Sequence, residues 1–231
     1  MTYRDVAGAS WRTEPALAAF LTEFLGAWPD TAGLTVIGSD ERTKPSWNGD
    51  VREVVGVGGS GRSVISVPPR YADAVREAVP TWEDVAEHLP AAVGKPGHHA
   101  FFGKFRWSTA PADLPDAGVW VDHDDPRVPP WLRPFGGQVL ITFMDGGYAA
   151  GVGIKRHNKA GMELSVGTEE RYRGQGLATR LVAQAARKII AAGAIPIYLH
   201  DPANVASDRT ATAAGFPDLG WQILGLWSGE R

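Results

Sequence analysis

The spacing of apolar residues over the first hundred positions predicts a mixture of helices and strands. Apolar side chains fall on one helical stripe at 14–27, and helical spacing returns at 71–79 and at 81–92, where Thr81 is the expected N-cap. The glycines of residues 58–61 predict a hairpin turn between two strands. Short apolar runs predict strands at 34–37, 51–57, 62–67 and 100–107.

After Gly137 the pattern changes to strands followed by alternating helices and strands. Three strands come first, and then a long helix with an apolar stripe that ends at Gly193, the expected C-cap. The expected strands are 138–144, 148–155, 162–166, 195–200 and 222–227, and the expected helices are 176–192 and 204–214. Three antiparallel strands followed by helix, strand, helix and strand indicate an α+β (mixed α/β) fold with one βαβ crossover.

A proline-rich stretch separates these two patterns. Residues 108–134 carry six prolines and read as loop. We therefore expect an N-terminal α/β lobe at residues 1–110 and a second domain at residues 111–231. The first of these contains no recognisable chemical motif.

The overall charge gives no reason to expect a nucleic-acid partner. The 231 residues have the composition of a globular protein, 44% hydrophobic and 21% charged, and a formal net charge of −3 at pH 7. Between Lys155 and Lys188, however, there are eight basic residues and only three acidic ones, so this stretch is formally +5 and the remainder −8. One segment of the chain is thus suited to an anionic ligand.

The sequence contains no cysteine, which excludes disulfides, thiolate metal sites and a cysteine nucleophile. The polar run 122–125 fits no standard metal spacing, so we expect no metal. The N-terminus starts no signal-like apolar core, and the most apolar run, 189–199, is shorter than the roughly 20 residues of a membrane-spanning helix. We expect a soluble, cytoplasmic protein with no membrane partner, and no pattern fixes an oligomeric state.

The loop between the strand 162–166 and the following helix has the chemistry of an anion site. The start of a helix presents unpaired N–H groups and a partial positive charge. Gly174 and Gly176 lack Cβ atoms, so a phosphate can approach the backbone closely, and Arg171 and Arg173 add full charges. These features predict a ligand that carries a diphosphate.

Two common phosphate loops do not fit these residues. A Walker loop has Lys and then Ser or Thr after its last glycine, whereas Gly176 is followed by Leu177 and Ala178. A dinucleotide loop needs a third glycine and a parallel sheet, and neither is expected here. What remains is the Arg-x-x-Gly-x-Gly loop of coenzyme A acyltransferases, at residues 171–176.

At these residues the sequence resembles the GNAT superfamily of acyl-CoA-dependent N-acyltransferases. The resemblance is carried by the strand ending at Val166, the loop 171–176 with the helix behind it, Asn204 with Ser207, and Gly215 with Phe216. It covers about residues 137–227 and implies a splayed mixed sheet with helices on both faces. By analogy of fold, the lobe 1–110 would be a degenerate acyltransferase-like half.

The resemblance also implies a ligand, acetyl-CoA, and the residues that hold it. One strand would pair through its backbone with the pantetheine arm, and the N–H groups of the loop would hold the pyrophosphate. The strand residues are Leu164, Ser165 and Val166, the loop residues are Arg171, Tyr172, Arg173, Gly174, Gln175, Gly176, Leu177 and Ala178, and Asn204 and Ser207 would lie on the pantetheine side. The thioester would lie where the strands 162–166 and 195–200 splay apart.

The catalytic residues are marked less clearly. The positions at which the family often has a tyrosine acid and a glutamate base hold Ala211 and Ala160. One candidate base is His200, which ends a strand beside the splay and whose imidazole titrates in a useful range. The other is Glu163, which lies three residues before Val166 and so on the opposite face of an unbulged strand. The candidate acids are Tyr148, Tyr172 and Tyr198.

Together these features predict an N-acetyltransferase that moves an acetyl group directly from acetyl-CoA to a primary amine of a small molecule or of a protein. An acyl-cysteine intermediate is excluded because the chain has no cysteine. Asp122 would attract a cationic amine substrate, although a polar run such as 122–125 is also typical of a solvated loop. Trp131 would line the acceptor pocket or pack between the two lobes. The alternative is a non-catalytic module that senses acyl-CoA, which the alanines at positions 160 and 211 favour.

Overall fold

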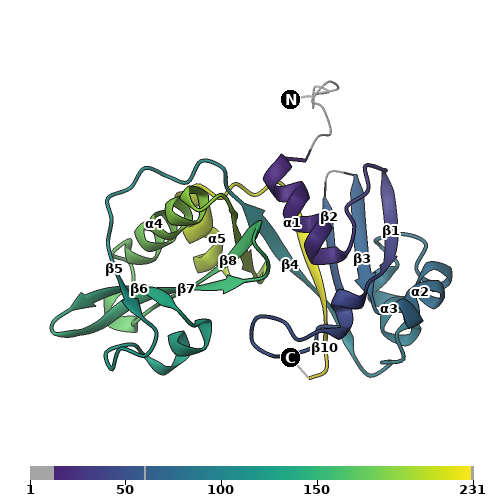
Figure 1. Ribbon diagram of the computed structural model, residues 1–231, viewed down its shortest axis with the longest axis horizontal. Coiled ribbons are helices and arrows are strands. Elements are labelled where there is room, and N and C mark those ends of the chain that lie inside the picture. Colours follow the sequence, from purple (N-terminus) through teal and green to yellow (C-terminus); the bar gives the residue numbers. More distant parts are fainter. Residues whose placement is uncertain (1–12, 60, 230–231) are drawn as a thin grey trace.

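The computed structural model describes residues 13–59 and 61–229, and a single mixed sheet runs through both halves of the molecule (Figure 1). Its strand order is β1-β3-β2-β10-β4-β9-β8-β7-β6-β5. The strands are β1 (Gly33–Gly38), β2 (Val55–Gly59), β3 (Arg62–Val67), β4 (His99–Trp107), β5 (Val119–Asp122), β6 (Gln138–Met144), β7 (Gly147–Arg156), β8 (Gly161–Thr168), β9 (Ile195–His200) and β10 (Gln222–Trp227). The α-helices are α1 (Pro15–Leu25), α2 (Ala72–Ala78), α3 (Val85–Ala92), α4 (Leu177–Ala191) and α5 (Val205–Ala213).

The order of elements predicted for the second half is confirmed. β6, β7 and β8 are antiparallel neighbours, and β8 is joined to the parallel strand β9 by the crossover helix α4. Gly193, which follows this helix, has φ +80° and so adopts the left-handed conformation expected of a C-terminal cap. The fold is a mixed α/β architecture with one βαβ unit.

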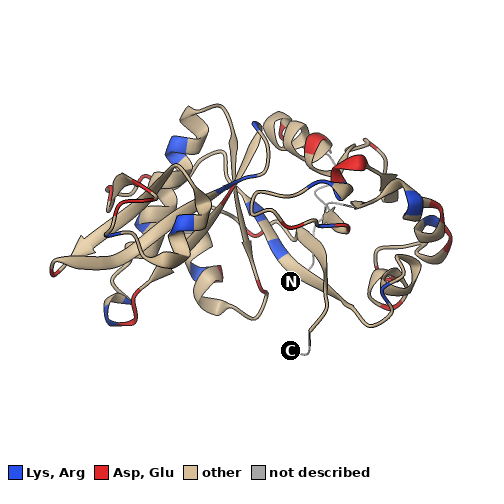
Figure 2. Ribbon diagram, turned by 60° about the horizontal axis from the view of Figure 1, so that its bottom comes forward, with Lys and Arg blue, Asp and Glu red and all other residues tan. Residues whose placement is uncertain are grey.

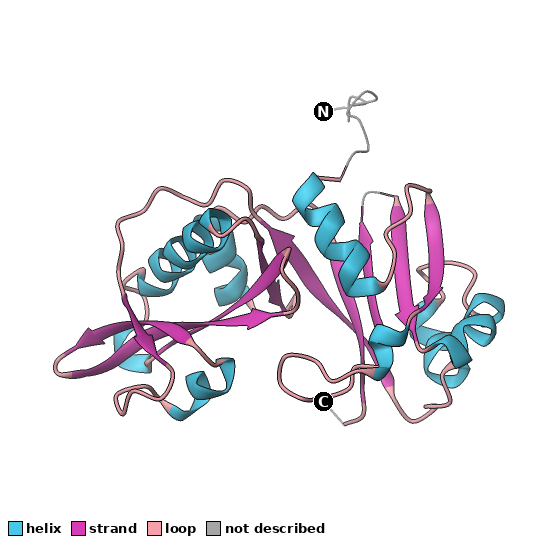
Figure 3. Cartoon of the chain, viewed as in Figure 1, coloured by secondary structure: helices cyan, strands magenta, loops and turns pink. Residues whose placement is uncertain are grey.

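Side-chain alternation along β9 divides the core between the two faces of the sheet. Ile195 and Ile197 pack with α1 in one apolar cluster, whereas Tyr198 packs with α4 and α5 in another. A third cluster holds α2 and α3 against the N-terminal strands. Helices therefore cover both faces, as predicted (Figure 3). We call the side of the sheet that carries Ile197 the α1 face and the side that carries Tyr198 the α5 face.

The last strand, β10, lies in the middle of the sheet rather than at its edge. It pairs antiparallel with β2 on one side and with β4 on the other, and Leu224 has a partner in each, Gly56 and Phe102. The C-terminal strand thus joins the segment 1–110 to the rest of the chain through backbone hydrogen bonds. The division into a lobe at 1–110 and a domain at 111–231 stays a prediction.

Several predicted boundaries were wrong. The helix expected from Thr81 begins at Val85, because the N–H and hydroxyl of Thr81 both donate to the carboxylate of Asp84 and close a turn before the helix. The strand expected at 51–57 begins at Val55. The stretch 108–134 contains the strand β5 and the start of a 3-10 helix, η3 (Pro130–Phe135), whose first turn tolerates proline. Ser60, in the predicted hairpin turn, lies outside the described residues.

We predict that Leu224→Ala destabilises the whole sheet, because Leu224 is 1% exposed at the centre of β10. Truncating a buried leucine leaves a cavity and costs about 2–5 kcal/mol of unfolding free energy. Urea unfolding followed by circular dichroism measures this cost. The control is Leu219→Ala, at a position that is 51% exposed, for which a change of at most about 0.5 kcal/mol is expected. Equal effects of the two variants would contradict the central role of β10.

Candidate functional site

The parallel strands β8 and β9 are paired over only part of their length. β8 and β9 pair from Gly161 with Ile195 to Leu164 with Tyr198. Beyond this point β8 continues to Thr168, while β9 stays paired with β4 on its other edge, from Ile197 to His200. Ser165 and Val166 therefore have a strand partner only on the β7 side. A free backbone edge faces the gap between the two strands, so an extended ligand can add there as a further strand would.

A loop with two left-handed glycines connects the end of β8 to helix α4. Gly174 and Gly176 have φ of +77° and +74°, and a Cβ added at either would meet no atom within 4 Å. Such φ values are readily adopted only by glycine. The loop is thus shaped by its glycines, and the space beside them is open.

No side chain of the first turn of α4 offsets the partial positive charge at the N-terminus of this helix. Gly176 is the N-cap, no side chain caps the helix, and the first turn contains no acidic residue. In this described segment the helical ladder begins with the bond from the Arg180 N–H to the Gly176 carbonyl (3.2 Å). Earlier in the loop, the N–H groups of Tyr172 and Arg173 donate to the carbonyls of Glu169 and Glu170 (2.9 and 3.1 Å). The N–H groups of the first helical turn have no partner within the helix, which makes this turn a place for an anion.

Tyr172 anchors the loop while its arginines stay outside. The buried Tyr172 ring sits in the apolar cluster of α4, and its hydroxyl donates to Asp145 Oδ2 (2.7 Å) in the β6–β7 turn. Arg171 stacks over that ring, with its guanidinium carbon 4.6 Å from the ring centre. Arg171 and Arg173 are exposed at the loop surface. Figure 2 shows Lys and Arg positions on both halves of the molecule, so basic residues are not confined to this loop.

Asn204 and Ser207 begin helix α5 across the gap from the loop. Asn204 is the N-cap, and its side-chain oxygen accepts from the Ser207 N–H (3.0 Å). The cap uses the amide oxygen rather than the amide nitrogen. Both residues lie on the α5 face, where Ser207 is close enough to Tyr198 to act on its pKa. The predicted pantetheine residues are thus close to the unpaired ends of β8 and β9.

A cavity of about 610 Å³ lies beside the gap and brings Glu163 and His200 together in its lining. Phe24 of α1, Leu199 of β9 and Ile223 of β10 also line it, which places it mainly on the α1 face. Leu164 and Val166 pack instead against the cluster of α4 and α5. Leu164 and Val166, which are predicted for the cofactor, therefore lie on the opposite face of the sheet from Phe24 and Glu163, whereas His200 lines the cavity from the end of β9.

Glu163 is buried and holds two basic groups. Its Oε1 pairs with Lys155 of the neighbouring strand β7, and its Oε2 lies 2.9 Å from His157 Nε2. Burial raises the pKa of the Glu163 carboxyl, but the hydrogen bond from His157 and the charge of Lys155 outweigh burial and leave that pKa below its usual value. Glu163 is thus an ionised carboxylate whose two oxygens are both engaged.

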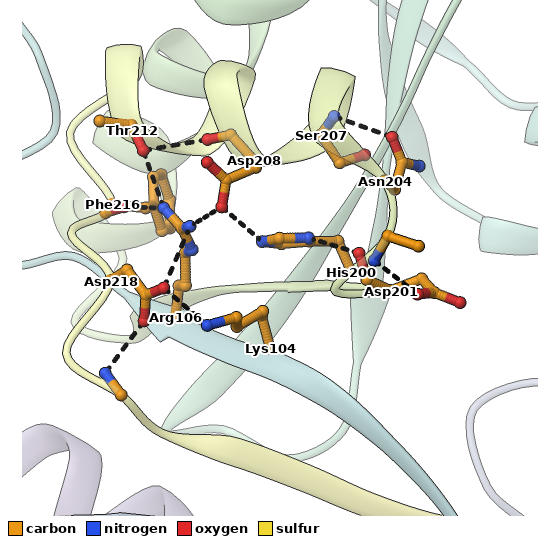
Figure 4. A network of polar contacts seen from close by, with 12 residues as sticks. Lys104, Arg106, His200, Asp201, Asn204, Ser207, Asp208, Thr212, Phe216 and Asp218 are labelled. Carbon is orange, nitrogen blue, oxygen red and sulfur yellow. Dashed lines mark hydrogen bonds and ion pairs between the residues drawn. The ribbon is translucent and has the colours of Figure 1, made fainter.

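His200 lies at the end of β9 with its ring directed toward α5 (Figure 4). Its Nδ1 is 3.0 Å from the Asp201 carbonyl, and since a carbonyl only accepts, Nδ1 carries a proton in this arrangement. Its Nε2 is buried 3.9 Å from Asp208 Oδ1 and has no hydrogen-bond partner among the described residues. The catalytic role assigned to His200 stays a prediction.

Arg106 completes the polar network around His200. This arginine of β4 is 1% exposed and pairs with Asp208, donates to Thr212 Oγ1 (2.9 Å) and donates to the Phe216 carbonyl (3.1 Å) (Figure 4). These three partners lie on α5 or shortly after it, and Asp218 is a fourth partner, 3.6 Å from Arg106 Nη2. A buried charge needs such partners. The network fixes α5, and with it Asn204, against the end of β9.

The three tyrosines considered as acids are all shifted toward weaker acidity. Burial raises the pKa of Tyr148 to about 12, and its hydroxyl donates to the Gly167 carbonyl (3.1 Å). The hydrogen bond with Asp145 raises the pKa of Tyr172, and burial raises that of Tyr198. No tyrosine stands out as the proton donor.

The two residues predicted to bind the acceptor lie in different places. Trp131, in η3, lies on the α1 face over Gly167, where a Cβ would come within 2.8 Å of its ring. Asp122 ends the edge strand β5, separated from β8 by β6 and β7. Neither lines the 610 Å³ cavity, and neither role is tested.

His157 and Arg106 were missed by the sequence analysis. His157 and Glu163 are six residues apart in the sequence, and the β7–β8 hairpin brings them together. Only the register of this hairpin could have predicted their contact. Arg106 sits in an apolar run that predicts a strand but gives no partner for a charge. No cluster of three or more metal-ligating side chains and no helix able to cross a membrane occurs in the described ranges.

Comparison with known proteins shows which family the chain belongs to. Residues 100–216 match the family described as the acetyltransferase (GNAT) family. A GCN5-related N-acetyltransferase-like protein from Streptococcus suis has 17% identity and a TM-score of 0.49, over 91% of this chain and 98% of that chain. A GNAT-family acetyltransferase from Novosphingobium aromaticivorans has 24% identity and a TM-score of 0.48, over 59% of this chain and 69% of that chain. No curated protein matches the sequence.

We predict that Glu163→Gln makes stability less dependent on acid pH. Because the folded-state pKa of Glu163 is below its usual value, its contribution is present above about pH 4.3 and is lost as the pH falls through the folded pKa. At neutral pH the variant leaves Lys155 and His157 without their carboxylate and costs about 1–3 kcal/mol. Urea unfolding at a series of pH values should show this difference shrinking below about pH 5.

The control for this series is Glu77→Gln, an exposed position on α2. Its stability curve should run parallel to that of the unmodified protein. A Glu163→Gln difference that stays constant from neutral to acid pH would show that the carboxylate is not ionised in the folded state.

Proposed function

Because the chain belongs to the acetyltransferase (GNAT) family, we propose that it transfers an acetyl group directly from acetyl-CoA to a primary amine of a small molecule or of a protein. The match begins within β4 and ends at Phe216, so it includes the gap between β8 and β9 and the loop before α4. The observation that carries the proposal is the uncapped start of α4 beside Gly174 and Gly176. The enzyme is an acyltransferase, and the donor and the acceptor are the proposed parts.

The donor would bind on the α5 face. Of the N–H groups of residues 171–178, those of Tyr172 and Arg173 already donate to the carbonyls of Glu169 and Glu170, so the pyrophosphate would accept from the others. Arg171 and Arg173 would add charge at the loop surface. Its pantetheine arm would pair with the free edge of β8 at Leu164, Ser165 and Val166, with Asn204 and Ser207 on the other side. The thioester would then lie in the gap beyond Leu164 and Tyr198.

The acceptor would reach the same gap from the α1 face, through the 610 Å³ cavity. This volume is typical of a small-molecule site, and an amine-bearing side chain of a protein would also fit it. The amine nitrogen attacks the thioester carbonyl, a bond to nitrogen forms, and the bond to sulfur breaks. CoA leaves as a thiolate, and the proton of the amine passes to a base. A backbone N–H near Val166 would stabilise the developing oxyanion.

We predict that Gly176→Ala weakens CoA binding at least 10-fold, because the added Cβ occupies the space where a phosphate would meet the backbone. Isothermal titration calorimetry with CoA and acetyl-CoA measures the affinity. The matched control is Gly193→Ala at the other end of α4. Gly193 also has a left-handed φ (+80°) and open space at its Cβ, so both variants carry the same backbone strain.

Gly193→Ala should keep the CoA affinity within about twofold, since its strain lies far from the loop. If the two alanine variants weaken binding equally, the loop does not hold the phosphates. If the unmodified protein releases no heat with either ligand at millimolar concentration, the proposed donor is wrong.

Turnover separates an enzyme from a module that only senses acyl-CoA. We predict that the protein releases free CoA thiol from acetyl-CoA in the presence of at least one of tyramine, spermidine and a lysine-containing peptide. Thiol release without any amine is the background to be subtracted. Tight CoA binding with no turnover on any of these amines would favour the sensor.

A further inference from the structure

We propose that His157 is the residue that takes the proton from the acceptor amine, and that Glu163 is the positioning residue that holds it. The inference rests on the proposed acetyl transfer and adds the base that the sequence leaves open. Its starting point is that His157 lines the 610 Å³ cavity and also a second cavity of about 300 Å³ next to it.

His157 is placed for contact with a ligand while being shielded from bulk solvent. It follows β7 directly and reaches back to Glu163 at the start of β8. Its side chain is 9% exposed, and Phe24 of α1 packs against the ring at 5.1 Å between centroids. Phe24 lines both cavities as well. The imidazole thus forms part of the wall between the two cavities.

Glu163 is poorly suited to accept the proton itself. Its two oxygens are engaged by Lys155 and His157, and these partners keep its pKa below the usual value despite its burial. An alkylammonium ion has a pKa of about 10 in water, so a carboxylate stabilised in its ionised form is a weak base for it. An imidazole, by contrast, titrates near neutral pH.

The hydrogen bond between the two residues determines which nitrogen can act. An ionised carboxylate only accepts, so His157 Nε2 must carry the proton that it shares with Glu163. In the neutral ring the other nitrogen, Nδ1, is then the acceptor. When Nδ1 takes a proton from the amine, the ring becomes an imidazolium, and the adjacent carboxylate stabilises that charge. No proton moves to Glu163 in this step.

The two cavities that His157 lines also contain other charged groups, among them Asp50, Glu53, Lys95 and Asp201 of the larger cavity. The others are Lys155 and Arg156 from β7, Glu163 from β8, Glu23 from α1, and Glu41, Arg42, Lys44 and Arg52 from the segment after β1. Of these, Glu163 is the one that makes a hydrogen bond or ion pair with His157. Glu163 is therefore the charged group that holds the His157 ring in place.

His200, the other buried histidine of the cavity, is oriented differently. Its ring belongs to the α5 face, and its Nε2 is directed at Asp208 (3.9 Å). Both histidines line the 610 Å³ cavity, but His157 also lines the second cavity, which His200 does not. The geometry thus favours His157.

The test is the pH dependence of kcat/KM, measured with the amine of the panel that is acetylated fastest. His157→Gln should lower kcat/KM about 100-fold or more and remove the fall of activity on the acid side. Glu163→Gln should move that acid limb to lower pH, because the charge that favours the imidazolium is gone. His88→Gln, at an exposed position on α3, is the control and should behave like the unmodified protein.

CoA affinity, measured by calorimetry in each variant, separates this inference from the proposed function. Retained CoA binding with the predicted pH profiles supports His157. The inference is overturned if His157→Gln keeps the acid limb, if His200→Gln loses it instead, or if Glu163→Gln lowers the rate equally at every pH. If the unmodified protein does not bind CoA, the proposed function is overturned, and this inference with it. Should His157→Gln not fold, the Glu163→Gln profile decides alone.

Discussion

The separation of β8 from β9 after four paired residues is the constraint on which the rest of the site depends. Up to Leu164 and Tyr198 the two strands satisfy each other's backbone groups, and beyond them they cannot. Backbone N–H and C=O groups left without a partner are costly unless water or a ligand pairs with them. The gap is therefore an edge of sheet in the middle of the molecule, which a polar, extended ligand can complete. The loop and the first turn of α4 supply charge beside that edge, and neither would form a site without it.

On the edge that faces away from β8, strand β9 is held by its pairing with β4. β9 pairs with β4 over Ile197 to His200, and β4 in turn carries the buried Arg106. The pairing of Arg106 with Asp208 of α5 ties the helix after β9 to the strand beside it. Removing one partner of such a pair would leave a buried charge, which costs far more than the pair contributes. The network is therefore best understood as a device that fixes position. It fixes the end of β9, and through α5 it fixes Asn204.

The parts that could be predicted from the sequence are those set by neighbours along the chain. The glycines at 174 and 176, the apolar stripe of α4 and the cap at Asn204 act within a few residues, so the loop and the crossover were found. The position of β10 between β2 and β4 depends on pairings across more than a hundred residues, and nothing local encodes them. His157 was missed for the same reason on a smaller scale: its partner is set by the register of a hairpin. The strand β5 was missed because its four residues lie within a stretch that is dominated by proline.

In the proposed reaction, alternation along β8 would allow one strand to contact both substrates, each from its own face of the sheet. Leu164 and Glu163 are neighbours in the chain, yet one packs toward α4 and α5 and the other faces the cavity on the α1 face. A ligand with a diphosphate and an amine with its own charge would therefore approach from opposite sides, each with its own ionisable groups. The two could meet only where the sheet is open. Because an ammonium ion cannot attack a carbonyl, the base must lie on the side from which the amine enters. In the proposed reaction this requirement, rather than proximity to the gap alone, would favour His157 over His200.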